Sequence, residues 1–122
     1  HTQIEIAVTD AIGIGLNPPV RESGDIKGSA GAVLVGPAGE VKIEEGVVVA
    51  QRHLHFNPAE AKNLGVSSGE IVRVRAGDGN GRSTVFEDVV VRVSADYSLE
   101  FHVDTDEANA AGIKTGDIVH IA

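Results

Sequence analysis

The feature of this sequence that most constrains its fold is an internal repeat. Residues 57–74 align with residues 104–121 at a shift of 47 positions, and six of the eighteen aligned residues are identical. Each copy predicts a short helix that ends at a glycine and is followed by a strand. Two copies are too few for a solenoid, because stacked repeats need at least about three units to bury a continuous core. We therefore expect the two halves of one pseudo-symmetric barrel.

The spacing inside the repeat also resembles a known half-motif. After its helix, each copy has the pattern Gly-hydrophobic-x-x-Gly-acidic-x-Val, which is similar to half of a double-psi β-barrel. The composition agrees, since 15 glycines and only 3% aromatic residues predict tight turns around a core of Val, Ile, Leu and Ala. The expected fold class is mainly β, with pseudo-symmetric β-barrels capped by short helices and a double-psi-like internal repeat.

Local signals predict most of the individual elements. Asn57 is a good helix N-cap, Pro58 suits the first helical position, and Glu60 completes a capping box. Gly65 is the expected end of that helix. Glycines and prolines predict a long loop over 10–31 and a turn over 76–82. The expected strands are 3–8, 32–35, 40–43, 47–50, 70–75, 84–94 with a bend near Glu87, 98–103 and 117–122.

Three histidines form a candidate metal site. His53 and His55 lie in the extended stretch 51–58, where residues two apart project to the same side, and imidazole is a common metal ligand. The repeat carries His55 onto His102 and His53 onto Glu100, and equivalent positions can approach each other near a pseudo-two-fold axis. Three imidazoles with an open position are a typical ligand set of a catalytic zinc. The alternative for His53 and His55 is two polar residues on the solvent face of a strand, and the alternative for His102 is a core or rim histidine that is hydrogen-bonded locally.

Charge and residue usage exclude several function classes. The net charge is −8 and no Lys/Arg cluster occurs, which argues against nucleic-acid binding. The absence of cysteine excludes a disulfide scaffold, a thiolate metal site and a cysteine nucleophile. No apolar run approaches membrane-spanning length, so we expect a soluble chain without membrane contact. His120 aligns with Arg73, a strand position expected to face water, and has no predicted chemical role.

Several blocks of the chain resemble one enzyme family. Residues 48–61, followed by Gly65-Val66-x-x-Gly69, are similar to the second metal-binding segment of the PduL-type phosphate acyltransferases. These enzymes are the phosphate propanoyltransferases of bacterial propanediol-utilisation systems. Residues 99–112 are similar to the segment near the C-terminus of the family. Shorter matches at 19–25, 29–31, 35–37 and 45–47 extend the resemblance over essentially the whole chain.

This resemblance implies a specific activity and specific metal ligands. It implies a zinc enzyme that interconverts acyl-CoA (propanoyl-CoA or acetyl-CoA) plus phosphate with acyl phosphate plus CoA. Family members consist of two β-barrels and hold two Zn²⁺ ions. Carried over by position, His53, His55 and His102 match the ligands of one zinc, and Glu5 matches the carboxylate that serves the other. An exposed strand glutamate is the alternative interpretation of Glu5.

The resemblance also implies a missing part. The family has an earlier His-x-His segment and a phosphate-binding arginine upstream of the blocks matched here. We therefore expect the C-terminal two-thirds of such an enzyme, with residues 1–50 in a central barrel that is incomplete without upstream sequence and residues 51–122 in a C-terminal barrel with short capping helices. A segment or chain supplying the second His-x-His is an expected partner, and a homo-oligomer is compatible with the sequence. The implied location is the bacterial cytoplasm, inside a bacterial microcompartment.

The residues present favour one mechanism over another. Because the chain has no cysteine, direct attack of phosphate on the thioester is simpler than a covalent cysteinyl intermediate. Arg52 is adjacent to the ligands, but strand alternation directs it to the other face, so we expect a structural role or a contact with CoA at the rim. Two other functions stay open: a non-catalytic metal-binding or assembly fragment, and a zinc-dependent thioester hydrolase.

Overall fold

The two copies of the repeat form equivalent helices in the computed structural model, which describes residues 1–77, 79 and 81–122. In α2 (Pro58–Leu64) the Asn57 side chain accepts from the backbone of Glu60, while the Glu60 side chain accepts from the backbone of Asn57. α3 (Thr105–Ala111) begins with the same reciprocal pair and, like α2, ends at a glycine in the left-handed region. Both capping boxes satisfy backbone N–H groups that the first helical turn leaves unpaired. The predicted equivalence of the two copies is confirmed at this level.

The chain folds into two compact units, unit 1 (His1–Gln51) and unit 2 (Arg52–Ala122). Both consist mainly of strands with short helices, as the composition predicted. No helix in the described part of the chain is long and apolar enough to cross a membrane.

Unit 1 is assembled around the long strand β4 (Gly39–Ala50). β3 (Ala30–Gly36) pairs with β4 in an antiparallel hairpin, which confirms the predicted hairpin. Two short strands, β1 (Ile4–Glu5) and β2 (Val20–Arg21), pair with β4 in parallel. Near its end β4 is buried at residues 47–49, consistent with the continuous apolar run there.

The N-terminal prediction of one strand over 3–8 and a loop over 10–31 is wrong in detail. The strand is limited to β1, and α1 (Val8–Gly13) follows it directly. Ala11 anchors this helix in the interior with 1% of its surface exposed, and Asp10 places negative charge in the first turn, where it complements the helix dipole. The segment predicted as a loop also contains β2 and the start of β3. Such short elements are stabilised by pairing with β4, a contact between distant residues that local patterns do not report.

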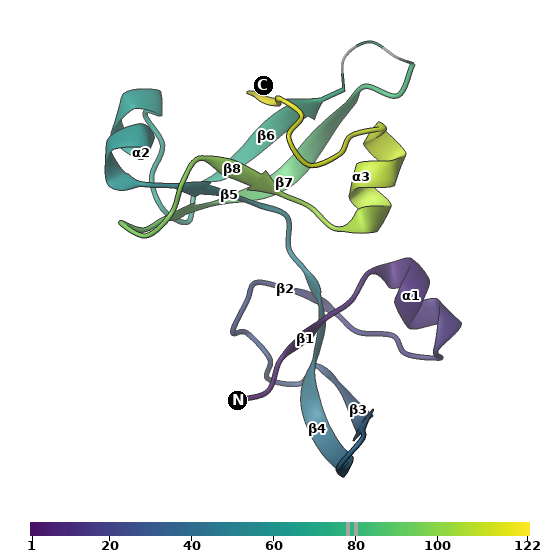
Figure 1. Ribbon diagram of the computed structural model, residues 1–122. Coiled ribbons are helices and arrows are strands. Elements are labelled where there is room, and N and C mark those ends of the chain that lie inside the picture. The colour runs from purple at the N-terminus through teal and green to yellow at the C-terminus, as the bar shows by residue number, and fades with distance from the viewer. Residues whose placement is uncertain (78, 80) are drawn as a thin grey trace. The chain divides into compact units, whose positions relative to one another are not determined.

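Unit 2 contains one five-stranded sheet, curled into a half-barrel (Figure 1), whose strands in spatial order are β8 (Glu100–His102), β5 (His53–Phe56), β7 (Thr84–Val93), β6 (Ile71–Ala76) and β9 (His120–Ile121). β5 and β7 are parallel, and the other neighbours are antiparallel. The double-psi arrangement of the connections between these strands stays a prediction. In the predicted turn at 76–82, Asp78 and Asn80 lie outside the described residues. Several of these strands are shorter than predicted.

The predicted bend in β7 is present as a bulge at Glu87 and Asp88. The pairing of β6 with β7 shifts by one residue there, and Asp88 has a φ of 57°, in the left-handed region. The bulge changes which residues face inward, since Phe86, Val89 and Val91 all belong to the core. Arg92, which follows the bulge, therefore lies on the face of the sheet opposite to Val89 and Val91.

The core of unit 2 determines where its histidines point. Leu54 and Phe56 of β5 are buried in the core cluster with residues from β6, β7, α2 and α3. Burial of a side chain of this size contributes about 1.5–3 kcal/mol to stability. Because side chains alternate along a strand, burial of Leu54 and Phe56 directs His53 and His55 to the opposite face.

Candidate metal centre

The pairing of β5 with β8 brings the third histidine to the first two. His53 and His102 are direct cross-strand partners, and His55 is the partner of Glu100. Partners in an antiparallel pair project to the same face of the sheet. The three histidines that the sequence selected therefore occupy one face, although 47 residues separate the last two.

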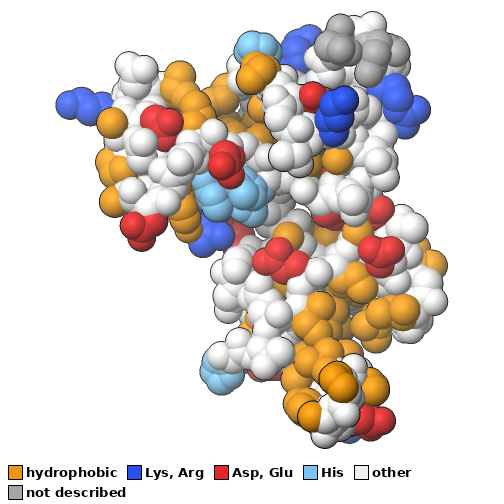
Figure 2. All heavy atoms as spheres, viewed as in Figure 1, with side chains coloured by type: hydrophobic (Ala, Val, Ile, Leu, Met, Phe, Trp, Pro, Cys, Tyr) orange, Lys and Arg blue, Asp and Glu red, His pale blue; other side chains and the backbone are white. Residues whose placement is uncertain are grey.

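The geometry of this histidine cluster (His53, His55 and His102) is compact. One nitrogen from each ring can be chosen so that all three lie within 4.8 Å of one another. The ring centroids are 4.8 Å apart for His53 and His55, 4.9 Å for His53 and His102, and 4.3 Å for His55 and His102. All three side chains are partly exposed, and Figure 2 shows a group of histidine side chains at the surface of unit 2. A ligand could therefore reach the rings from solvent.

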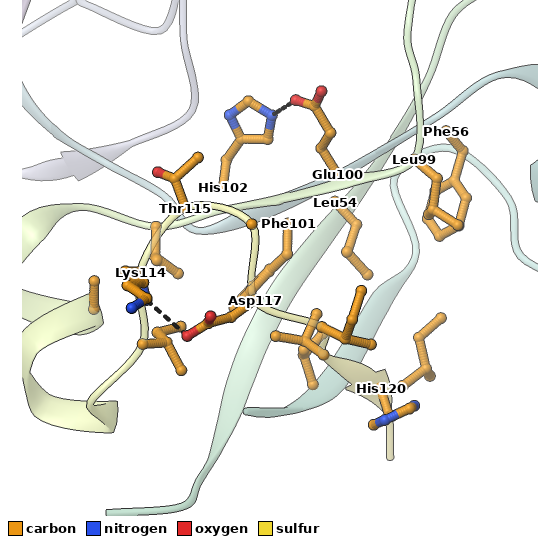
Figure 3. Close-up of a pocket in the computed structure, with 18 of the residues that line it drawn as sticks. Leu54, Phe56, Leu99, Glu100, Phe101, His102, Lys114, Thr115, Asp117 and His120 are labelled. Carbon is orange, nitrogen blue, oxygen red and sulfur yellow. Dashed lines mark hydrogen bonds and ion pairs between the residues drawn. The ribbon is translucent and has the colours of Figure 1, made fainter. Parts of the chain in front are cut away.

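A carboxylate completes the polar side of the cluster. Glu100 Oε2 lies 3.0 Å from His102 Nε2. Figure 3 shows this pair on one side of β8, with Phe101 and Leu54 on the other. When Nε2 carries the proton, it donates to Glu100 and leaves the Nδ1 lone pair for a metal. Carboxylate–histidine pairs of this kind fix the ring orientation and the tautomer in metal sites.

The only tyrosine of the chain packs on the cluster. Tyr97 stacks on His55 with ring centroids 3.9 Å apart and an interplanar angle of 10°. The tyrosine follows β7 in the chain, and its backbone N–H donates to Ser94, which holds the turn that carries it. The stack restricts rotation of the His55 ring. Sequence reasoning missed Tyr97, because nothing in the local pattern links it to a histidine 42 positions away.

The surroundings of His55 favour its neutral form. Burial lowers the pKa of His55 below its usual value of 6.5, and the neighbouring His102, His53 and Arg92 lower this pKa further. Glu100 acts in the opposite direction. Since only a neutral imidazole can donate a lone pair, these effects prepare His55 for metal binding at neutral pH.

The donor set fits a zinc-type ion. Three imidazole nitrogens from one face of a sheet, with solvent access on the remaining side, correspond to a site that keeps an open coordination position. No thiolate competes, and the nearby carboxylate adds a further oxygen donor or a ring partner. The convergence expected from the repeat is therefore observed.

Arg52 has a structural role at the start of β5. Its Nε lies 2.5 Å from Glu107 Oε2, and its Nη1 donates to the Glu87 carbonyl at 3.1 Å. The guanidinium also lies over the Phe86 ring, 5.0 Å from the centroid. Because Glu107 belongs to the capping box of α3, Arg52 connects the strand of His53 to the helix that follows His102.

Comparison with known proteins identifies the family. Residues 1–114 match the sequence profile of the phosphate propanoyltransferases. The chain belongs to this family. The phosphate propanoyltransferase of Thermotoga maritima is 51% identical over 121 residues, which are 99% of this chain and 57% of that protein. That of Lachnoclostridium phytofermentans is 49% identical over 120 residues (98% and 55%), and that of Shewanella putrefaciens is 50% identical over 119 residues (98% and 56%).

The family resemblance predicted from the motifs is thus confirmed. The chain spans a little more than half the length of these phosphate propanoyltransferases.

The remaining predicted ligand of the family pattern lies in the other unit. Glu5 is on β1 of unit 1, its side chain is exposed, and its Oε1 accepts from Gln3 Nε2 at 3.0 Å. It is accessible to a metal, and its role as a ligand of a second zinc stays a prediction. His120, which had no predicted role, lies at the exposed edge strand β9, away from the cluster residues in the sheet order.

A pocket of unit 2 adjoins the strand pair β5 and β8. Its lining includes the core-facing side chains of Leu54, Phe56 and Phe101, residues 113–121, and also Glu100 and His102 (Figure 3). In this phosphate propanoyltransferase family member, burial alternates along β5, with Leu54 and Phe56 buried and His53 and His55 partly exposed, so the strand has one apolar face and one polar face. The apolar side secures the strands, and the polar side is available for chemistry.

Proposed function

We propose that this chain supplies a zinc-binding part of the active site of a phosphate acyltransferase. The reaction is the reversible conversion of acyl-CoA, with a propanoyl or acetyl group, and phosphate into acyl phosphate and CoA. The observation that supports the proposal best is the convergence of His53, His55 and His102 on one face of unit 2 in a chain of this family.

The histidine cluster would hold one Zn²⁺, with Glu100 as a ring partner or further donor. A zinc ion bound there supplies Lewis-acid chemistry, which is the polarisation of a carbonyl group and the neutralisation of anionic charge. The protein residues orient the ligands: Tyr97 restricts the His55 ring, and Glu100 holds His102. Such contacts would hold the ligand nitrogens in place for the ion.

The acyl transfer itself would need no nucleophile from this chain. In the forward direction a phosphate oxygen forms a bond with the thioester carbonyl carbon, the carbon–sulfur bond breaks, and CoA leaves as the thiolate. The chain contains no cysteine that could form a covalent acyl intermediate. Its residues would instead bind and position the two substrates, and bringing two reactants together supplies a large part of such rate enhancements.

The complete active site would also include residues from a further polypeptide segment. Glu5 would serve a second zinc, and a segment with another His-x-His would complete its ligands. This segment is the expected partner of the chain, and acyl-CoA and phosphate are the expected substrates. From the family resemblance, the proposed location is the bacterial cytoplasm, within a microcompartment that processes propanediol.

A CoA-release assay tests the proposal and separates it from the two alternatives. Propanoyl-CoA is incubated with the zinc-loaded chain, with and without the part of the Thermotoga maritima relative that this chain does not match, and in the presence or absence of phosphate. We expect phosphate-dependent CoA release that disappears in His55→Ala and persists in the control His120→Ala. Zinc binding without CoA release in any mixture would favour a metal-binding or assembly fragment. Release that is indifferent to phosphate would favour a thioester hydrolase.

A further inference from the structure

Arg92 is the cation closest in register to the histidine cluster. It lies on β7 directly beside His55 of β5, in a parallel pair whose aligned residues project to the same face. The bulge at Glu87 and Asp88 places Val89 and Val91 in the core and so directs Arg92 to the histidine face. Across the three strands, Arg92, His55 and Glu100 form one continuous row.

The charge of Arg92 is not used by any ion pair of the described residues. Arg21, Arg52 and Arg73 each pair with a carboxylate, whereas Arg92 is absent from every salt bridge and side-chain hydrogen bond in the described part of the chain. It is nevertheless half-buried, and its charge acts on the His55 ring. In a chain with a net charge of −8, a guanidinium without an ion pair beside three imidazoles is a local positive group, which Glu100 in the same row offsets only in part.

Such a site is complementary to an oxyanion. A guanidinium presents donors in a planar fork that matches two oxygens of a phosphate group, which makes arginine a preferred residue for this contact. A cation beside a metal-binding cluster is unfavourable unless an anion also binds there. The position of Arg92, one strand away from His55, would allow one phosphate group to contact both the guanidinium and the cluster.

We propose that Arg92 binds a phosphate group of a substrate at the histidine cluster. The inference rests on the proposed function, because it assumes that the cluster holds zinc and that a substrate anion approaches it. It adds a substrate-positioning residue on this chain to the phosphate-binding arginine expected elsewhere in the family. The phosphate group could come from inorganic phosphate or from CoA, and the test separates these sources.

The test measures anion binding by the zinc-loaded chain. Inorganic phosphate and CoA are titrated separately by calorimetry into the wild type, Arg92→Gln, Arg92→Lys and the control Arg75→Gln. Arg75 is a matched control because it is exposed on the neighbouring strand β6 and forms no ion pair among the described residues. Zinc content and the far-UV circular dichroism spectrum are recorded for every variant.

We expect Arg92→Gln to weaken binding roughly tenfold or more, the loss typical for a charged hydrogen-bond donor. Arg92→Lys should lose part of the affinity, because it keeps the charge without the fork, and Arg75→Gln should bind as the wild type does. If only the binding of phosphate is weakened, Arg92 binds inorganic phosphate. If only the binding of CoA is weakened, Arg92 binds a phosphate group of CoA. Either result supports the inference. Wild-type affinity for both anions in zinc-loaded Arg92→Gln overturns the inference. If Arg92→Gln does not fold, the same result in zinc-loaded Arg92→Lys overturns it. A wild type that holds no zinc overturns the proposed function and this inference together.

Discussion

Leu54 and Phe101 are cross-strand partners in the antiparallel pair of β5 and β8, and each is the equivalent of the other in the repeat. The pseudo-two-fold axis of the repeat therefore passes between them. The flanking pairs, His53 with His102 and His55 with Glu100, are equivalent to each other by the same symmetry. Both copies thus contribute to a single cluster at the axis, where one of the four equivalent positions carries Glu100 in place of a histidine.

Glu100 should contribute to metal affinity although it is not a histidine. Glu100→Ala removes the partner of His102 Nε2, and loss of such a ring partner typically weakens metal binding by about 10–100-fold. Glu100→Gln should give an intermediate loss, because its amide oxygen can still accept from the ring. Competition with a chromogenic chelator measures the zinc Kd, with the exposed Glu40→Ala on β4 as the control. Equal zinc affinity in Glu100→Ala and the wild type would refute this role.

Tyr97 should act through its ring rather than its hydroxyl group. Tyr97→Phe keeps the stack on His55 and should retain the zinc affinity of the wild type. Tyr97→Ala frees the imidazole and should weaken zinc binding by roughly 2–10-fold, since such ring pairs contribute about 0.5–1.5 kcal/mol. The visible absorption spectrum of the cobalt-substituted chain provides an independent signal of altered His55 geometry. If Phe and Ala at this position behaved alike, the stack would not orient the ligand.

The Arg52–Glu107 ion pair should stabilise unit 2 more than the Arg73–Glu87 pair does. The side chains of the first pair are 30% and 16% exposed, against 58% and 59% in the second. Arg52→Met should therefore lower the free energy of unfolding by about 1–2 kcal/mol, and Arg73→Met by less than about 0.5 kcal/mol. Urea unfolding of the metal-free chain measures both. Equal effects of the two substitutions would show that Arg52 is not a special connection between β5 and α3.

The stability of the metal-free chain should fall as the pH is lowered toward the pKa of folded His55. The folded state lowers this pKa below 6.5, so between the two values the unfolded chain binds more protons than the folded chain does. The free energy of unfolding therefore rises with pH through this interval and reaches its full His55 contribution above about pH 6.5. Urea unfolding over a pH series tests this, and His55→Asn should show a smaller pH dependence. An unchanged slope in His55→Asn would contradict the assigned pKa direction.

The parts of the fold that depend on neighbouring residues in the sequence were predictable. The capping boxes, the glycine at the end of each helix and the β3–β4 hairpin all arise from local chemistry at positions such as Asn57 and Gly36. The repeat extended this reach, because it related His55 to His102 and thereby predicted a convergence between distant segments. The cysteine-free composition also limited the metal ligands to histidine and carboxylate.

The remaining features depend on contacts between distant residues. α1 and β2 are too short to have a clear periodicity, and β2 forms because β4 provides a partner for it. The turn after β7 places Tyr97 on the ring of His55, and the bulge at Asp88 places Arg92 beside His55. Neither arrangement has a recognisable sequence motif. A shift of one residue in that bulge would move Arg92 to the other face, which a sequence pattern cannot specify.

The zinc stoichiometry of the purified chain tests the central claim most directly. The wild type and the exposed-edge control His120→Ala are equilibrated with zinc, dialysed and measured by elemental analysis beside His53→Ala, His55→Ala and His102→Ala. The proposed centre predicts about one tightly bound ion at the cluster in the wild type and the control, with each cluster substitution removing it while the circular dichroism spectrum is preserved. Full zinc occupancy in folded His55→Ala and His102→Ala would contradict the metal centre at these three histidines.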